Sequence, residues 1–137
     1  MKIFTSTDPV RYYETDQMGI VHHSNYIRFF ENARSQMMVE LGCPIEEFEK
    51  RYGVLIPIVS VECRYRHPAR LGDTLTSTAA VGKAPGAKME VIQTVVNQRG
   101  EICAEGLVVL GFIDAKTFRP VRCPEVIAKM FEDISNA

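Results

Sequence analysis

The stretch YETDQMGIVHHSNYIRFFENARSQMMVELG, residues 13–42, decides how the rest of the chain is organised. Between Gly19 and Gly42 it contains no glycine or proline. Its apolar residues recur at spacings of three and four: Tyr26, Phe30, Ala33, Met37 and Leu41. Such spacing places them on one face of a helix, and an apolar face of this length must be buried. We therefore expect a long helix packed against the remainder of the protein, with Gly42 and Pro44 as its stop.

Ionisable side chains come directly before this helix. Glu14 and Asp16 precede a turn at residues 18–19, and His22 and His23 follow that turn. The first N–H groups of a helix have no partner inside the helix, and the helix dipole adds partial positive charge there. A carboxylate delivered to such a helix start could attack a carbonyl or activate water while the amides stabilise the negative charge that develops.

The remaining segments are mostly strand-like. Residues 9–14 read as a short strand, residues 45–52 as a short helix closed by Gly53, and Pro124 as the start of a helix within residues 120–136. Apolar and polar residues alternate over 55–66, which predicts a half-buried strand, and we expect three further strands at 74–81, 89–97 and 102–113. The last two predict a hairpin around residues 98–101. One helix among several strands argues for an α+β fold, with a single antiparallel sheet curled around the long helix.

Size and composition exclude several classes of protein. With 137 residues, 46% apolar and 24% charged, the chain fits one soluble globular domain, residues 1–137. A net charge of −1 gives no reason to expect nucleic acid or a membrane as partner. No signal peptide and no run of roughly 20 apolar residues is visible, so we expect a cytoplasmic protein. Its four cysteines lie far apart in the sequence and are expected to be reduced: Cys43, Cys63, Cys103 and Cys123.

A longer motif gives the first indication of family. The string TDQMGIVHHSNY at 15–26 leads straight into the predicted helix, and HPARLGDTL follows at 67–75. In the first string, the residues that match the family are Asp16, Gly19, Val21, His23, Asn25 and Tyr26. With these two strings the chain resembles, over essentially its whole length, the acyl-CoA thioesterases of the 4-hydroxybenzoyl-CoA thioesterase family. The resemblance implies a hotdog fold, in which one long central helix is wrapped by a curved antiparallel sheet.

The resemblance also assigns roles to individual residues. It makes Asp16 the catalytic nucleophile or general base, and it uses the backbone amide of His23 to polarise the thioester. The His23 imidazole could also transfer a proton. Gly19, His22 and Tyr26 are expected to contribute to substrate binding. The residues alone leave other readings open, since Asp16 could be a turn or capping residue and His23 a histidine bonded locally at a helix start. Glu14 is expected to be a surface or interface charge, and His67 a turn residue.

Coenzyme A carries phosphates, so the resemblance implies basic residues at the mouth of the pocket. Lys83, Lys88 and Arg119 lie at the corresponding places, although ordinary solvated charges are an equally good reading of each. No cofactor is expected, because coenzyme A is part of the substrate. No metal is expected either, because the three histidines lack the spacing of metal ligands. The family implies a homodimer with sheets edge to edge and active sites at the interface, or a homotetramer made of such dimers.

The expected activity is hydrolysis of an acyl-CoA thioester to a free carboxylic acid and CoA, with acyl carrier protein as the alternative carrier. Two other functions share this fold. One is a hydratase or dehydratase acting on acyl thioesters, and the other is a non-catalytic acyl-CoA-binding module. No Gly-x-Ser-x-Gly elbow and no glycine-rich phosphate loop is present, so the sequence gives no support for a serine hydrolase or a nucleotide-binding loop.

Overall fold

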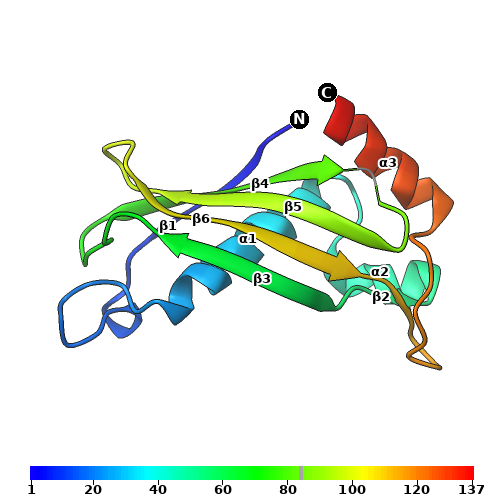
Figure 1. The fold of residues 1–137 in the computed structure, drawn as a ribbon, viewed down its shortest axis with the longest axis horizontal. Coiled ribbons are helices and arrows are strands. Elements are labelled where there is room, and N and C mark those ends of the chain that lie inside the picture. The colour runs from blue at the N-terminus through cyan, green and yellow to red at the C-terminus, as the bar shows by residue number, and fades with distance from the viewer. Residues whose placement is uncertain (84) are drawn as a thin grey trace.

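The computed structural model describes residues 1–83 and 85–137. Its largest feature is a five-stranded antiparallel sheet in the order β1-β4-β5-β6-β3, seen in Figure 1. The strands are β1 (Phe4–Pro9), β3 (Ile58–Tyr65), β4 (Thr74–Lys83), β5 (Lys88–Val96) and β6 (Ile102–Gly111). The β5–β6 hairpin is the one predicted, with Lys88 paired to Gly111 at one end and Val96 to Ile102 at the other. The sheet therefore has two edges, β1 and β3.

Helix α1 (Ser24–Glu40) covers one face of this sheet and contacts β1, β4 and β5 (Figure 1). Four of the five predicted apolar residues are buried, namely Tyr26, Phe30, Ala33 and Met37. The fifth, Leu41, lies just past the helix end and is half-buried. Gly42 takes a positive φ of 77°, which a glycine adopts without the penalty that a Cβ would bring, so the chain can turn away there. The long predicted helix is thus confirmed.

Two shorter α-helices accompany α1. Helix α2 (Ile45–Tyr52) has the predicted bounds and ends at Gly53, again at positive φ. Helix α3 (Glu125–Asn136) packs on β4 and buries Ile127, Phe131 and Ile134. All three helices lie where they were predicted, and α3 as well as α1 packs against the main sheet.

Two predicted strands are interrupted. The segment 55–66 divides into β2 (Val54–Leu55) and β3, separated by Pro57, which has no N–H to donate to a neighbouring strand. The segment 102–113 divides into β6 and β7 (Ile113–Asp114). Strands β2 and β7 pair with each other in a small second sheet. Both breaks occur where the chain leaves the main sheet.

The strand predicted at residues 9–14 is wrong. The strand lies earlier, at Phe4–Pro9, and residues 12–14 form a single 3-10 turn instead. The carboxylate of Glu14 accepts the backbone N–H of Arg11 at 2.7 Å and closes this turn. Tyr12 and Tyr13 favour strands by composition, yet both are more than three-quarters exposed. Local capping has therefore overridden the strand preference of two aromatic residues.

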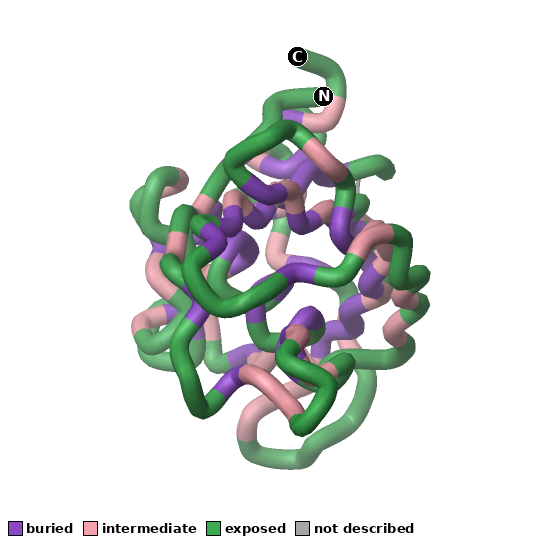
Figure 2. The backbone as a smooth tube through the Cα atoms, turned by 90° about the vertical axis from the view of Figure 1, so that its left-hand side faces the viewer, coloured by how far each residue is buried: buried purple, intermediate pink, exposed green. Residues whose placement is uncertain are grey.

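The core lies between α1 and the sheet. Figure 2 shows the buried segments in the interior and the exposed loops around them. The two termini lie side by side, and the N–H of Lys2 donates to the carbonyl of Ile134 at 2.9 Å. In residues 1–83 and 85–137 all four cysteines are free, and three of them are buried. No helix in these ranges is long and apolar enough to cross a membrane.

Candidate active site

The loop at residues 15–22 folds back on itself before α1 begins. Thr15 and Val21 form an isolated antiparallel bridge, and the N–H of Asp16 donates to the carbonyl of Ile20 at 2.9 Å. Gly19 takes a positive φ of 78°, which the tight turn requires. Asp16 Oδ1 accepts the N–H of Met18 at 2.8 Å, so one carboxylate oxygen stabilises the turn. Among the described residues the other oxygen, Oδ2, accepts no hydrogen bond and stays available.

The start of α1 presents a free amide. The N–H of His22 donates to the carbonyl of Glu14 at 2.8 Å, and the N–H of Ser24 donates to His22 Nδ1 at 3.2 Å. Within the described part of the chain, the N–H of His23 between them has no acceptor. His23 is the N-cap of α1, directly before Ser24, so its amide lies at the positive end of the helix dipole.

A cavity of ≈ 370 Å³ opens beside this loop. Asp16, His23 and Tyr26 all line it, so three of the predicted site residues are brought together. Gly19 and His22 adjoin the cavity without lining it. The His22 ring instead stacks on His23, with ring centroids 4.2 Å apart, and its Nδ1 lies 2.8 Å from Ser24 Oγ. The cavity thus has a carboxylate on one side and the helix start on the other.

Besides Met18, Ile20 and Val21 of the loop, the lining includes the end of β3 and the segment after it, which were not predicted to reach the site. Tyr65, Arg66, His67 and Pro68 line the cavity. The hydroxyl of Tyr65 donates to the carbonyl of His23 at 3.2 Å, and its ring lies edge-on to His23. The alternation of apolar residues placed Tyr65 on a strand face but did not indicate which loop that face meets.

Tyr26 joins the helix to the same segment. Its hydroxyl accepts the N–H of Ala69 at 3.3 Å. Burial raises the pKa of Tyr26 above its ordinary value of 10.0, so the hydroxyl stays protonated at neutral pH. The N–H of Val21 donates to the carbonyl of Ala69 at 2.8 Å, so Ala69 is fixed from both the loop and the helix. The segment after β3 is therefore held to both the loop and the helix by hydrogen bonds.

Glu14 differs from the expectation, whereas His67 lies in a bend after β3, as expected of a turn residue. Glu14, expected to be a surface or interface charge, is buried, because its carboxylate closes the 3-10 turn. His67 lines the cavity and pairs with Glu101, with 3.3 Å between Nε2 and Oε2. Because it directly follows β3, His67 also lies at the cavity.

The three basic residues expected to bind CoA phosphates lie elsewhere in the protomer. Strand β4 runs from Thr74, close to the Ala69 segment, to Lys83 at the opposite end of the sheet. Lys88 begins the next strand at that end, and Arg119 follows β7. All three side chains are exposed. One protomer by itself does not bring them to Asp16.

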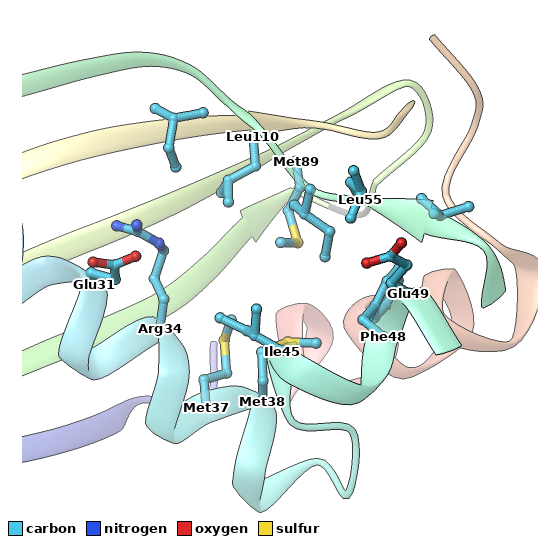
Figure 3. A pocket seen from close by; sticks show the side chains of 13 residues that line it. Glu31, Arg34, Met37, Met38, Ile45, Phe48, Glu49, Leu55, Met89 and Leu110 are labelled. Carbon is cyan, nitrogen blue, oxygen red and sulfur yellow. The ribbon is translucent and has the colours of Figure 1, made fainter. Parts of the chain in front are cut away.

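A second cavity, of ≈ 160 Å³, lies between α1, α2 and the ends of β3, β5 and β6 (Figure 3). Its lining is mostly apolar and includes Met37, Met38, Ile45, Phe48, Ile58 and Met89. Arg34 forms part of its wall, and its Nη1 donates to Gln93 Oε1 at 2.9 Å. Burial lowers the pKa of the Arg34 guanidinium below its ordinary value. Ile58 begins strand β3, whereas Tyr65 ends it, so the two cavities lie at opposite ends of this edge strand.

Metal binding is not indicated by the donor set. Across residues 1–83 and 85–137, no three His, Cys, Asp or Glu side chains are gathered closely enough to hold a metal ion. The residues that line the Asp16 cavity include one carboxylate, the residue at the start of α1, and tyrosine and histidine rings. This chemistry suits attack on a carbonyl with stabilisation of the resulting oxyanion.

Comparison with known proteins agrees with this description. Residues 10–131 match the model of the thioesterase-like superfamily. The acyl-CoA thioester hydrolase YbgC of Escherichia coli is 30% identical over 127 residues, which cover 90% of this chain and 93% of YbgC.

Among solved structures, protein TT1821 of Thermus thermophilus is 30% identical with a TM-score of 0.89, over 96% of this chain and 98% of that one. The DHNA-CoA thioesterase of Staphylococcus aureus is 26% identical with a TM-score of 0.88, over 99% and 91% of the two chains.

The curved antiparallel sheet packed against α1 is the fold of the hotdog thioesterases, and the predicted fold class is confirmed. The chain belongs to the thioesterase-like superfamily.

Proposed function

We propose that this protein is an acyl-CoA thioesterase, which hydrolyses a thioester to a free carboxylic acid and CoA. The observation that carries the proposal is that one cavity is lined by both Asp16 and His23. Among the described residues, Asp16 Oδ2 accepts no hydrogen bond and the N–H of His23, at the start of α1, has no acceptor. The names of the similar proteins support the same reaction, since YbgC is an acyl-CoA thioester hydrolase and the Staphylococcus aureus protein is a DHNA-CoA thioesterase.

In the proposed mechanism, the thioester carbonyl lies between these two groups. Asp16 Oδ2 either attacks the carbonyl carbon or takes a proton from the water that attacks it. The carbonyl oxygen becomes negative and accepts the His23 N–H, a contact worth roughly 3 kcal/mol in other acyl-transfer enzymes. The C–S bond then breaks, the CoA thiolate takes a proton, and water supplies the second oxygen of the acid.

The other rings of the site are assigned supporting roles. His23 lines the cavity, so its imidazole is a second catalytic candidate. Tyr26 forms part of the substrate-binding wall, Gly19 gives the loop its turn, and His22 supports the helix start through Ser24. Comparing His23→Ala with His22→Ala ranks the two histidines, and a larger loss of kcat is expected for His23.

The protein is proposed to work as a homodimer, or as a homotetramer of such dimers. The outer side of β3 has no strand partner among the described residues, and Ile58, Val59 and Tyr65 on that strand are about half exposed. Antiparallel pairing of β3 with its copy would place the apolar cavity of one protomer beside the Asp16 cavity of the other. The same pairing would bring Lys83, Lys88 and Arg119 of one protomer toward the Asp16 end of the other, where CoA phosphates are expected.

Release of free thiol from a panel of acyl-CoAs, measured with a thiol reagent, tests the function. Thiol release would support hydrolysis, and conversion of the acyl chain without thiol release would indicate a hydratase or dehydratase. Binding of acyl-CoA without any turnover would indicate a non-catalytic module. Acyl carrier protein thioesters in the same panel distinguish the two carriers. No cofactor should be needed in the assay, because coenzyme A enters with the substrate.

A further inference from the structure

We infer that Asn25 is a positioning residue, which holds the loop that carries Asp16 against the helix start that presents the His23 amide. The inference rests on the proposed function and adds a residue that has no role in it so far. Asn25 lies in the first turn of α1 and is only 7% exposed. Its side chain does not line the Asp16 cavity. Any effect of Asn25 on the reaction must therefore pass through other groups.

The contacts of Asn25 connect the two halves of the site. Asn25 Nδ2 donates to the carbonyl oxygen of Glu14 at 2.8 Å, in a buried position. The same oxygen accepts the N–H of His22, also at 2.8 Å. The backbone N–H of Asn25 donates to the carbonyl of His22 at 2.9 Å. Glu14, His22 and Asn25 thus form one closed set of hydrogen bonds at the base of the loop.

These hydrogen bonds lie next in sequence to the two groups proposed to carry the reaction. Asp16 lies two residues after Glu14, and the His23 amide lies between His22 and Asn25. Fixing Glu14 and His22 to the same helix turn therefore fixes the carboxylate and the amide relative to each other. Buried polar groups with their partners in place specify one arrangement, and small displacements of reacting groups are costly in rate. Asn supplies what the site needs here, because its amide donates to a carbonyl without adding a charge.

A purely structural role is the competing explanation, and Gln93 provides a matched control. Gln93 is fully buried, and its Nε2 donates to the carbonyl of Phe30 on the same helix at 2.7 Å. It is not among the residues that line the Asp16 cavity. Asn25→Ala and Gln93→Leu each remove a buried side-chain donor from a backbone carbonyl, and Gln93→Leu also removes the oxygen that accepts from Arg34 Nη1. Only the first is expected to disturb the loop.

The experiment measures kcat and KM for thiol release by the full chain. Asn25→Ala should lower kcat about tenfold to a hundredfold while KM changes less than about threefold, and Gln93→Leu should lower Tm with kcat retained. Asn25→Asp keeps the shape but replaces the donor with an acceptor, so it should lose at least as much activity as Asn25→Ala. If Asn25→Ala does not fold, Asn25→Ser replaces it in every comparison.

A double-mutant cycle with Asp16→Asn separates positioning from general damage. If Asn25 acts through Asp16, then Asn25→Ala should change the residual kcat of Asp16→Asn less than about twofold. Equal fold losses in both backgrounds, or full kcat in Asn25→Ala, would overturn the inference while leaving the proposed function intact. Lack of thiol release from every acyl-CoA by the wild-type protein would instead overturn the proposed function.

Hydrogen exchange gives a readout that does not depend on activity. In the wild type the amides of Val21 and His22 are hydrogen bonded to Ala69 and Glu14. Asn25→Ala should speed exchange of these loop amides more than Gln93→Leu does at equal loss of Tm. Unchanged exchange across residues 15–22 would contradict the inference.

Discussion

Two aspartates of this chain form the same kind of turn, and only one of them faces the candidate site. Asp16 Oδ1 accepts the N–H of Met18, whereas Asp114 Oδ1 accepts the N–H groups of Lys116 and Thr117. An asparagine can accept these backbone amides through its side-chain oxygen. Exchanging either aspartate for asparagine therefore keeps the turn and removes the negative charge, which separates chemistry from structure.

Asp16→Asn should lower kcat by about 10²- to 10⁴-fold, because the amide is neither a nucleophile nor a base at neutral pH. The circular dichroism spectrum and Tm should stay close to those of the wild type. Asp114→Asn is the matched control and should retain kcat within about twofold. An Asp16→Asn variant with full kcat would remove Asp16 from the mechanism.

The packing of α1 on the sheet depends on a residue with no side chain. Gly106 lies in β6 opposite Cys63 of β3, and a Cβ there would overlap the carbonyl oxygen of Glu62. The same Cβ would stand 2.9 Å from Cε2 of Phe30, a core residue of α1. Helix and edge strand thus approach β6 at one point, and only glycine fits between them.

Gly106→Ala should therefore lower the free energy of unfolding by about 1–3 kcal/mol, the usual cost of overpacking. Gly82→Ala is the comparison, because a Cβ at Gly82 meets first the flexible tip of Ile92, at 3.0 Å. Urea unfolding of the two variants measures the difference. Equal stability of both would show that β3 and Phe30 can move away without cost.

Elements whose residue spacing and turn residues agree were predicted well. The first strand, where two local preferences compete, was not. The buried face of α1, the end of α2 at Gly53 and the β5–β6 hairpin all follow from spacing and turn residues that lie close together in the sequence. The first strand was misplaced, because Tyr12 and Tyr13 favour strands while the capping contact of Glu14 favours a turn.

The candidate site divides in the same way. Asp16, His23 and Tyr26 lie in one short motif, and the structure gathers them in one cavity. Tyr65 and His67 reach that cavity from the far end of β3, and only the register of the sheet brings them there. Within one protomer Lys83, Lys88 and Arg119 lie away from Asp16. Only the proposed pairing of two copies would bring them toward it, and no pattern within one chain specifies such pairing.

Protonation of Asp73 should contribute to unfolding of the protein in acid. Asp73 is buried directly before β4, beside the β5–β6 turn. Burial raises the pKa of Asp73, but hydrogen bonds from Gln98 Nε2 and the N–H of Arg70 outweigh it, with a smaller contribution from Arg99. The net pKa in the folded state lies below the ordinary 3.8. The stabilisation is therefore present above that value and is lost as pH falls through the lower folded-state pKa.

Asp73→Asn should accordingly flatten the fall in the free energy of unfolding as pH drops below about 4. Urea unfolding at several pH values between neutral and strongly acidic conditions measures the slope. Asp133→Asn on α3, which pairs with Lys129 while 63% exposed, is the control and should leave the slope nearly unchanged. Identical slopes in the wild type and Asp73→Asn would rule Asp73 out as a source of acid sensitivity.

The free edge of β3 should decide both assembly and activity. Val59 lies on this strand with half of its surface exposed, and a lysine there would place a charge in any strand-to-strand contact. Val59→Lys should therefore shift sedimentation from dimer or tetramer to monomer, and kcat/KM should fall with it because the acyl and phosphate contacts of the partner are lost.

Val126→Lys alters an equally apolar exposed residue on α3 and should retain assembly and activity. A monomeric Val59→Lys with full kcat/KM would show that one protomer carries a complete site, and an active wild-type monomer would remove β3 pairing from the mechanism altogether.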